Sequence, residues 1–274
     1  GENGEVSYKN SKLEYFKGNE FFIDWPTNGL PDREIGWRYL ILYAMKRAKK
    51  IYTRFGMDTK KADAVAKNLD GYDYKPSEFI QVTALGVLAG KISADEAKPL
   101  LKQGGAKGMT TFMSFAITEA LGIAGEGEFA LSVVKEYFGA MLDLGATSFW
   151  EDFDTEWLKD DPLPLDAVPE KGRKNIHADY GKFCYLGLRH SLCHGWSCGF
   201  IDFLYKYVLG VIPTESGYKA IKIEPHLYGL TFVEGRIPTK YGVIRIKHEL
   251  KNGKIETETD IPKEIDCNFI GCRK

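Results

Sequence analysis

The stretch REIGWRYLILYAMKRAKKIYTRF, residues 33–55, sets the helical character of the chain. Apolar and aromatic residues recur along it three and four positions apart, which is the spacing of one face of an α-helix. Gly56 follows at once, and glycine readily adopts the left-handed conformation that closes a helix. The sequence therefore predicts a long amphipathic helix from Arg33 to Phe55. Its apolar stripe consists of Trp37, Leu40, Ile41, Ala44, Ala48 and Ile51.

Similar helical patterns, joined by short loops, continue as far as residue 210. Three prolines, at positions 162, 164 and 169, instead predict a loop or lid edge over residues 154–174. The further predicted helices are Asp58 or Thr59 to Leu69, Ser77–Leu88, Ser93–Lys102, Met109–Leu121, Glu126–Leu144, His177–Leu188 and Ser197–Leu209.

After Pro213 the hydrophobic period changes from 3.6 to 2, which indicates strands. The dipeptide Asn252-Gly253 is a strong signal for a type I′ hairpin turn. We predict strands at Tyr218–Ile223, Thr231–Ile237, Val243–Leu250 and Ile255–Ile261.

These patterns predict a mainly α protein with two domains. Residues 1–214 are expected to form an (α/α) toroid, and residues 215–274 a C-terminal antiparallel β-sandwich. Helical hairpins followed by a β appendage favour a six-hairpin (α/α)6 barrel, but about eight helices are too few to close one. An incomplete ring leaves apolar helix faces uncovered, so we expect self-association through the open seam.

The composition excludes some kinds of partner. With 274 residues and 44% apolar residues the chain can build a sizeable core, and its net charge of −1 gives no reason to expect nucleic acid or an anionic membrane surface. No apolar run is long enough to span a membrane and no signal peptide opens the chain, so we expect a soluble protein. The sequence does not determine the cellular compartment; a longer parent protein could be periplasmic or secreted.

The five cysteines do not form the framework of a small disulfide-rich domain. Cys193 and Cys198 flank His194 at a spacing that resembles a metal site, but no second Cys or His pair matches it. We therefore expect no metal and no cofactor, and interpret the thiols as buried small hydrophobic groups.

Two clusters carry the candidate chemistry: GATSFWEDF at residues 145–153 and HSLCHGWS at residues 190–197. Indole rings can stack on the C–H faces of a sugar, carboxylates and imidazoles bind its hydroxyls, and carboxylates are the usual acid and base groups of glycoside hydrolysis. The candidate site residues are Glu151, His194, Trp150 and Trp196, with Asp24 and Trp25 as further lining of the same cleft. The alternatives left open are core aromatic residues and a structurally hydrogen-bonded histidine.

The first cluster resembles the G-A-T-T-x-W-E-x-W/F segment of glycoside hydrolase family 78, the bacterial α-L-rhamnosidases. His194, in its Ser-x-x-His-Gly-Trp setting, resembles a later histidine of that family, and residues 22–25, FIDW, are similar to its G-D-W segment. Residues 223–225, 229–231 and 238–242 resemble its C-terminal β domain. The resemblance implies an (α/α)6 barrel and an inverting mechanism, with Glu151 as the general base and His194 binding a sugar hydroxyl or orienting the base.

One motif of that family is missing. Its general acid lies in a C-P-x-R-D-E-R-x-G-W motif, and the nearest stretch here, residues 32–37, has a shorter Glu–Trp spacing and no Cys-Pro before it. Glu34 also opens a helix, where acidic residues are favoured by the helix dipole. We therefore expect the chain to carry the base but not the acid, as the C-terminal part of a rhamnosidase-like protein or a degenerate relative.

Two functions from different classes follow. The first is hydrolysis of terminal α-L-rhamnosyl residues from glycosides or polysaccharides, with a rhamnose-containing carbohydrate as partner. The second is a non-catalytic carbohydrate-binding or scaffold fragment. A third option is another (α/α)6 enzyme such as a fucosidase or a polysaccharide lyase, and the neutral aromatic cluster does not favour a lyase.

Overall fold

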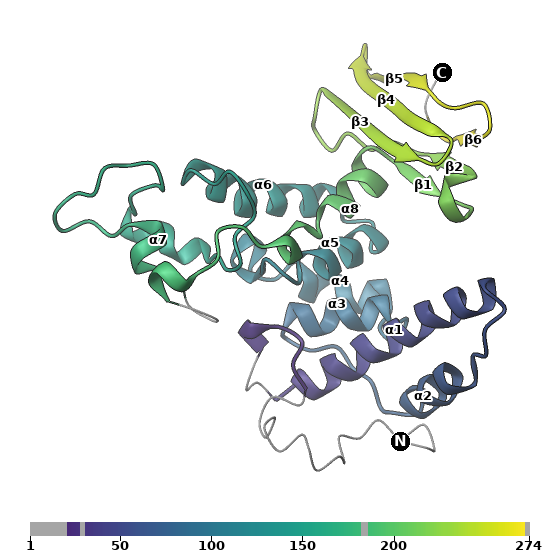
Figure 1. Cartoon of the computed structure of the whole chain (residues 1–274), viewed down its shortest axis with the longest axis horizontal. Helices are drawn as coiled ribbons and strands as arrows, with labels where there is room; N and C mark the ends of the chain where they lie inside the picture. Colours follow the sequence, from purple (N-terminus) through teal and green to yellow (C-terminus); the bar gives the residue numbers. More distant parts are fainter. Residues whose placement is uncertain (1–20, 28–30, 182–185, 272–274) are drawn as a thin grey trace.

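The computed structural model describes residues 21–27, 31–181 and 186–271, and it divides into a helical part and a β part (Figure 1). In the described residues up to 208 the named elements are all helical, and the named strands begin at Val211. The predicted order, helices first and small sheets after them, is confirmed.

The predicted helices of the first half lie close to their expected bounds. The capping box at Ser93, whose hydroxyl accepts from the Glu96 N–H, explains why α4 begins there. The largest difference is at α5, which begins at Ser114 instead of Met109. The helices are α1 (Arg33–Arg54), α2 (Lys60–Asp70), α3 (Ile80–Leu88), α4 (Ala94–Leu101), α5 (Ser114–Ile123) and α6 (Gly127–Asp143).

The helices form a two-layered arc (Figure 1). One row is α1, α3, α5 and the short α8 (Ile201–Phe203), each packed on the next. The second row packs against the first: α2 on α1, α4 on α3 and α5, and α6 on α5. Both layers bury their apolar faces in one core, with Leu42, Leu85 and Ile117 almost fully inaccessible.

The segment between α6 and α8 departs most from the predictions. The expected loop contains a short 3-10 helix, Thr155–Asp160, whose Trp157 packs into the core. The helix predicted over His177–Leu188 does not hold, because α7 is only Ile176–Asp179 and Tyr180 is extended. Gly181 then takes a positive φ angle, which an α-helix does not allow, and Gly187, also at positive φ, opens a separate 3-10 turn (Gly187–Arg189). Residues 182–185 lie outside the described part.

The helix predicted over Ser197–Leu209 is a broken helical run. A 3-10 turn (Gly195–Cys198) precedes α8, and a π-helical turn (Leu204–Val208) follows it. Gly199 lets this run approach α5 closely, because a Cβ at that position would lie 2.5 Å from the Cβ of Phe115. The close approach places residues 190–200 against the start of α5.

The β part has two three-stranded sheets with the orders β1-β2-β6 and β3-β4-β5. β2 and β6 are parallel, which corrects the expectation of a purely antiparallel unit, and the other pairs are antiparallel. Asn252 and Gly253 both have positive φ, as the predicted hairpin turn requires. The strands are β1 (Val211–Pro213), β2 (Ala220–Ile223), β3 (Phe232–Thr239), β4 (Gly242–Lys251), β5 (Lys254–Asp260) and β6 (Asp266–Phe269).

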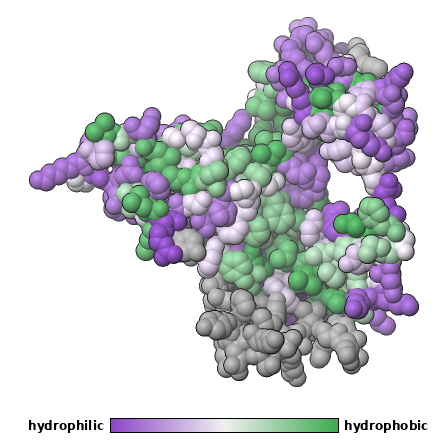
Figure 2. Space-filling view, in the orientation of Figure 1, coloured by the Kyte–Doolittle hydropathy of each residue, from purple (hydrophilic) through white to green (hydrophobic). Residues whose placement is uncertain are grey.

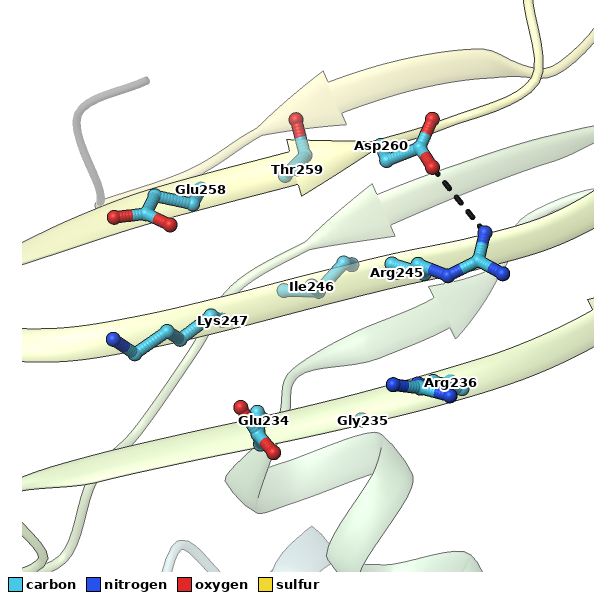
Figure 3. A pocket seen from close by; sticks show the side chains of 9 residues that line it. All are labelled: Glu234, Gly235, Arg236, Arg245, Ile246, Lys247, Glu258, Thr259 and Asp260. Carbon is cyan, nitrogen blue, oxygen red and sulfur yellow. Dashed lines mark hydrogen bonds and ion pairs between the residues drawn. The ribbon is translucent and has the colours of Figure 1, made fainter.

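The two sheets share a small apolar core that includes Ile221, Ile244 and Ile246. The other face of the β3-β4-β5 sheet is charged (Figure 3), with Arg245 and Asp260 paired at 3.2 Å. In the space-filling view the β part is accordingly mostly hydrophilic, whereas hydrophobic residues gather over the middle of the helical part (Figure 2). Within the described ranges, no helix has both the length and the apolar character needed to cross a membrane.

Candidate functional site

The two clusters found in the sequence lie side by side. Gly145, with φ of +86°, turns the chain after α6, and the backbone beyond it runs along residues 191–194. The N–H of Glu151 donates to the carbonyl of Ser191 at 2.8 Å, and the N–H of His194 donates to the carbonyl of Phe149 at 2.7 Å. The hydroxyl of Ser197 adds a bond of 2.6 Å to the carbonyl of Trp150.

Glu151 is held from several sides. Its side chain is buried, and its Oε2 accepts from the N–H of Ser191 at 3.2 Å. Its backbone carbonyl accepts from the Thr111 hydroxyl at 2.5 Å and from the indole N–H of Trp196 at 3.3 Å. Because both its backbone and one carboxylate oxygen are fixed, the carboxylate has a defined direction.

Beside Glu151 lies a group of three rings. The ring of Trp196 stacks on Phe112, with centroids 4.9 Å apart and 27° between the planes. The imidazole of His194 lies 4.5 Å from the Trp196 ring, tilted by 54°. Both His194 and Trp196 are only partly buried, so they can offer a flat, partly polar surface to a ligand.

Trp150 is oriented differently. Its side chain is completely inaccessible and packs edge-on against Phe153, with centroids 5.8 Å apart. Its indole N–H has no hydrogen-bond partner among the described residues. The sequence suggested a stacking platform, but in this structure the ring faces the core and no face of it is open to a sugar.

Asp24 reaches the same region through the adjacent residues Thr110 and Thr111. The Thr110 hydroxyl bonds to Asp24 Oδ2 at 2.6 Å, and the N–H of Trp25 bonds to Oδ1 at 2.8 Å. Burial raises the pKa of the Asp24 carboxyl to about 7; the two hydrogen bonds lower it, and the charge of Asp152 raises it. The ring of Trp25 packs edge-on against Phe22, 5.0 Å away, and is partly exposed.

Four residues of this region were not assigned to the site from the sequence: Thr110, Thr111, Asp152 and His190. His190 is buried, and its Nε2 accepts from the N–H of Asp152 at 3.0 Å. Burial lowers the pKa of His190, although the nearby carboxylates of Asp152 and Glu151 act in the opposite direction. Its Nδ1 has no partner among the described residues.

Other residues considered from the sequence lie elsewhere or differ. Glu34 pairs with Arg38 one turn along α1, where its side chain is half exposed. Cys193 is exposed in its loop, and Cys198 and Cys267 are only partly buried, so the expectation of buried thiols was wrong for these three. Cys184 and Cys272 lie outside the described residues. In the described ranges no group of three His, Cys, Asp or Glu side chains could hold a metal ion.

Comparison with known families places a match in the β part. Residues 210–270 match the family model of the bacterial α-L-rhamnosidase C-terminal domain. This segment covers both sheets of the β part, so the β part is similar to that domain. A comparison of the sequence with curated proteins gives no match.

The fold matches solved rhamnosidases. A family 78 rhamnosidase from Bacillus sp. GL1 aligns over 86% of this chain and 26% of its own, with a TM-score of 0.64 and 22% identity. The Streptomyces avermitilis α-L-rhamnosidase, solved with L-rhamnose, aligns over 86% and 23%, with a TM-score of 0.64 and 14% identity. The α-L-rhamnosidase of Dictyoglomus thermophilum aligns over 87% and 27%, with a TM-score of 0.59 and 19% identity.

The chain thus spans about a quarter of the length of the rhamnosidases it matches. The resemblance inferred from the sequence is confirmed at two levels. The β part matches the C-terminal domain family, and most of the chain has the fold of the corresponding portion of these enzymes.

Proposed function

We propose that this chain is part of an α-L-rhamnosidase and supplies the general base of an inverting hydrolysis. The observation that carries the proposal is the environment of Glu151: a buried carboxylate, held by Ser191 and lying beside the partly exposed ring of Trp196. The fold and the β domain support the reaction class, and the L-rhamnose complex of the Streptomyces avermitilis enzyme supports a rhamnose-containing substrate.

The proposed chemistry follows from these contacts. In an inverting glycosidase one carboxylate removes a proton from the attacking water, while a carboxylic acid across the sugar protonates the leaving oxygen. In Glu151 the Ser191 N–H engages Oε2, which leaves Oε1 to accept the proton of a water molecule. His194 and Trp196 would contact the sugar, the imidazole through a hydroxyl and the indole through a C–H face.

The architecture of the whole enzyme belongs to the same proposal. The two-layered arc of helices would be one portion of an (α/α)6 barrel, with residues 1–214 as its helical domain and residues 215–274 as the β-sandwich. The general acid would come from elsewhere in a longer protein. Both carboxyl oxygens of Asp24 already accept hydrogen bonds, from the Thr110 hydroxyl and the Trp25 N–H, and Glu34 is paired with Arg38 on α1, so we assign neither as the acid.

The second candidate function, a non-catalytic carbohydrate-binding or scaffold fragment, is favoured by one observation. Glu151 and Asp152 are both buried, which suits a carboxylate cluster that stabilises the junction of two loops. The two functions are distinguished by removing the charge of Glu151. Turnover falls if Glu151 is the catalytic base, and it does not fall if Glu151 has only a structural role.

The test is Glu151→Gln in the full-length parent protein, with Glu34→Gln as the matched control. The amide keeps the shape of the side chain but cannot take a proton, so we expect turnover to fall about 10²–10⁴-fold while substrate affinity changes little. Glu34→Gln should leave turnover unchanged. A natural rhamnoside should be measured beside p-nitrophenyl α-L-rhamnoside, because the acidic nitrophenol leaves with little assistance.

The 274-residue chain alone should not hydrolyse the natural rhamnoside. Clear activity of the short chain would mean that it carries its own acid, and undiminished turnover of the Glu151→Gln parent would overturn the base assignment.

A further inference from the structure

A cleft outside the candidate site is strongly basic. It has a volume of about 830 Å³ and lies between the exposed side of α1 and the turn at Ser216 in the β part. The space-filling view shows a hollow between the β part and the helical part (Figure 2). Of the residues that the structure describes, nine line the cleft, and none of these nine is acidic. Five are cations of α1: Lys46, Arg47, Lys49, Lys50 and Arg54.

Four of these cations share one face of the helix. With 3.6 residues per turn, positions 46, 47, 50 and 54 lie within about 100° of one another around the axis. Lys46, Lys50 and Arg54 are also spaced four residues apart, and like charges at this spacing destabilise a helix. The helix dipole favours cations only in the last turn, which accounts for Arg54 and not for Lys46 or Arg47.

Acidic partners within the described residues reach only Lys49 and Lys46 of these cations, and the charge of Asp70 acts on Lys46 without an ion pair. Lys49 pairs with Asp63 of α2 at 2.6 Å, and Lys46 donates to the carbonyl of Ala89 at 2.7 Å. Among the described residues, Arg47, Lys50 and Arg54 have no ion pair. In a chain of net charge −1, this cleft therefore concentrates uncompensated positive charge on one surface.

We propose that this cleft binds the carboxylates of an acidic polysaccharide. Lys46 to Arg54 covers about 12 Å of helix, at 1.5 Å per residue, so the row can engage more than one charged sugar residue. Leu88 also lines the cleft and adds apolar contact for sugar C–H groups, while the ring of Tyr43 lies under the guanidinium of Arg47, whose central carbon is 5.0 Å from the ring centroid. The anion site follows from the charges alone, whereas the choice of a saccharide rests on the proposed function.

The test is a binding measurement on the 274-residue chain with a labelled hexameric oligogalacturonate. The matched probe is the same oligosaccharide after reduction of its carboxyl groups. We expect binding of the acidic probe that weakens as salt is raised, and no binding of the reduced probe. The triple variant Lys46→Gln, Lys50→Gln and Arg54→Gln should raise Kd at least about tenfold, since it removes three charged donors.

The control is Lys60→Gln, Lys61→Gln and Lys67→Gln on the neighbouring α2, which removes equal charge outside the cleft and should leave Kd almost unchanged. Circular dichroism of each variant separates loss of binding from loss of fold. Equal binding of the reduced probe, or an equal loss in the α2 variant, would overturn the proposal. A single-stranded DNA of equal charge that bound as tightly would overturn the saccharide assignment. None of these outcomes depends on turnover, so they are distinct from failure of the Glu151 test.

Discussion

Glu151 and Ser191 are joined by two hydrogen bonds, one from the N–H of Glu151 to the Ser191 carbonyl at 2.8 Å and one from the N–H of Ser191 to Glu151 Oε2 at 3.2 Å. The first aligns the two chain segments, and the second fixes the carboxylate relative to both. The position of the proposed base thus depends on a loop that lies forty residues further along the sequence.

The Thr111 hydroxyl is expected to be a positioning group for Glu151. Thr111→Val keeps the shape but removes the donor to the Glu151 carbonyl, so we expect the free energy of unfolding to fall by about 1–2 kcal/mol. In the full-length parent, kcat should fall while KM stays close to its original value. Urea denaturation and steady-state kinetics measure the two effects. Thr111→Ser keeps the hydroxyl and should restore both; a serine variant as impaired as the valine one would argue against this role.

Asp24 should make the protein less stable as the pH rises. Its pKa is about 7 in the folded chain and about 3.8 when unfolded, so the folded state binds more protons between these values. The contribution of Asp24 to the free energy of unfolding is then largest below pH 4. This contribution, at most about 4 kcal/mol, is lost as the pH rises to 7. Asp24→Asn resembles the protonated form and should remove this loss.

Urea unfolding of both proteins from pH 4 to 8 tests this directly. The stability difference between Asp24→Asn and the original protein should grow with pH up to about 7 and then level off. A constant difference would show that Asp24 is ionised across the range.

The sequence predicted those elements whose side chains repeat with a regular period. α1 and α6 are long and periodic, and both were placed within one residue or two of their bounds. β1 and β6 are short, and they form strands because β2 lies between them and pairs with both. They were therefore missed.

The sequence predicted that the two clusters meet, but not how their side chains are oriented. The two clusters were identified by residue types that suit sugar binding, and both lie at the candidate site. The residue type alone does not predict whether a tryptophan is buried or exposed. The indole of Trp150 faces the core, whereas that of Trp196 lies at a partly open surface. Thr110 and Thr111 were missed because their hydroxyls bond to groups distant in sequence.

His248 should make the β domain sensitive to acid. It is completely buried, with Nδ1 2.7 Å from the Thr257 hydroxyl and Nε2 3.0 Å from the carbonyl of Leu209, and burial lowers its pKa below 6.5. The unfolded state therefore binds more protons below pH 6.5, and stability falls as the pH drops through this range. The direction is opposite to that of Asp24.

His248→Leu removes both bonds and leaves two polar groups unpaired, so we expect a loss of about 2–4 kcal/mol at pH 8, where the imidazole is neutral. The loss should shrink as the pH is lowered below 6.5, because the variant has no imidazole to protonate. Denaturation curves at pH 5 and pH 8 measure the change. A loss that is the same at both values would mean that His248 does not titrate on unfolding.

The apolar groove on α6 should cause self-association of the 274-residue chain. The groove has a volume of about 490 Å³, and Phe138, Leu142 and Phe149 line it. Leu142 is 67% exposed, and exposed apolar surface of this kind favours association in water. A second copy that covered the groove would remove this surface from solvent.

Light scattering over a range of concentrations should therefore show dimers or larger species. Leu142→Lys places a charge in the groove and should weaken association at least about tenfold, because burying a leucine contributes about 1.5–3 kcal/mol and an unpaired buried lysine costs more. Val168→Lys is the matched control, since Val168 is 81% exposed but does not line the groove. If the original chain stays monomeric at high concentration, or if both variants weaken association equally, the groove is not the surface through which copies meet.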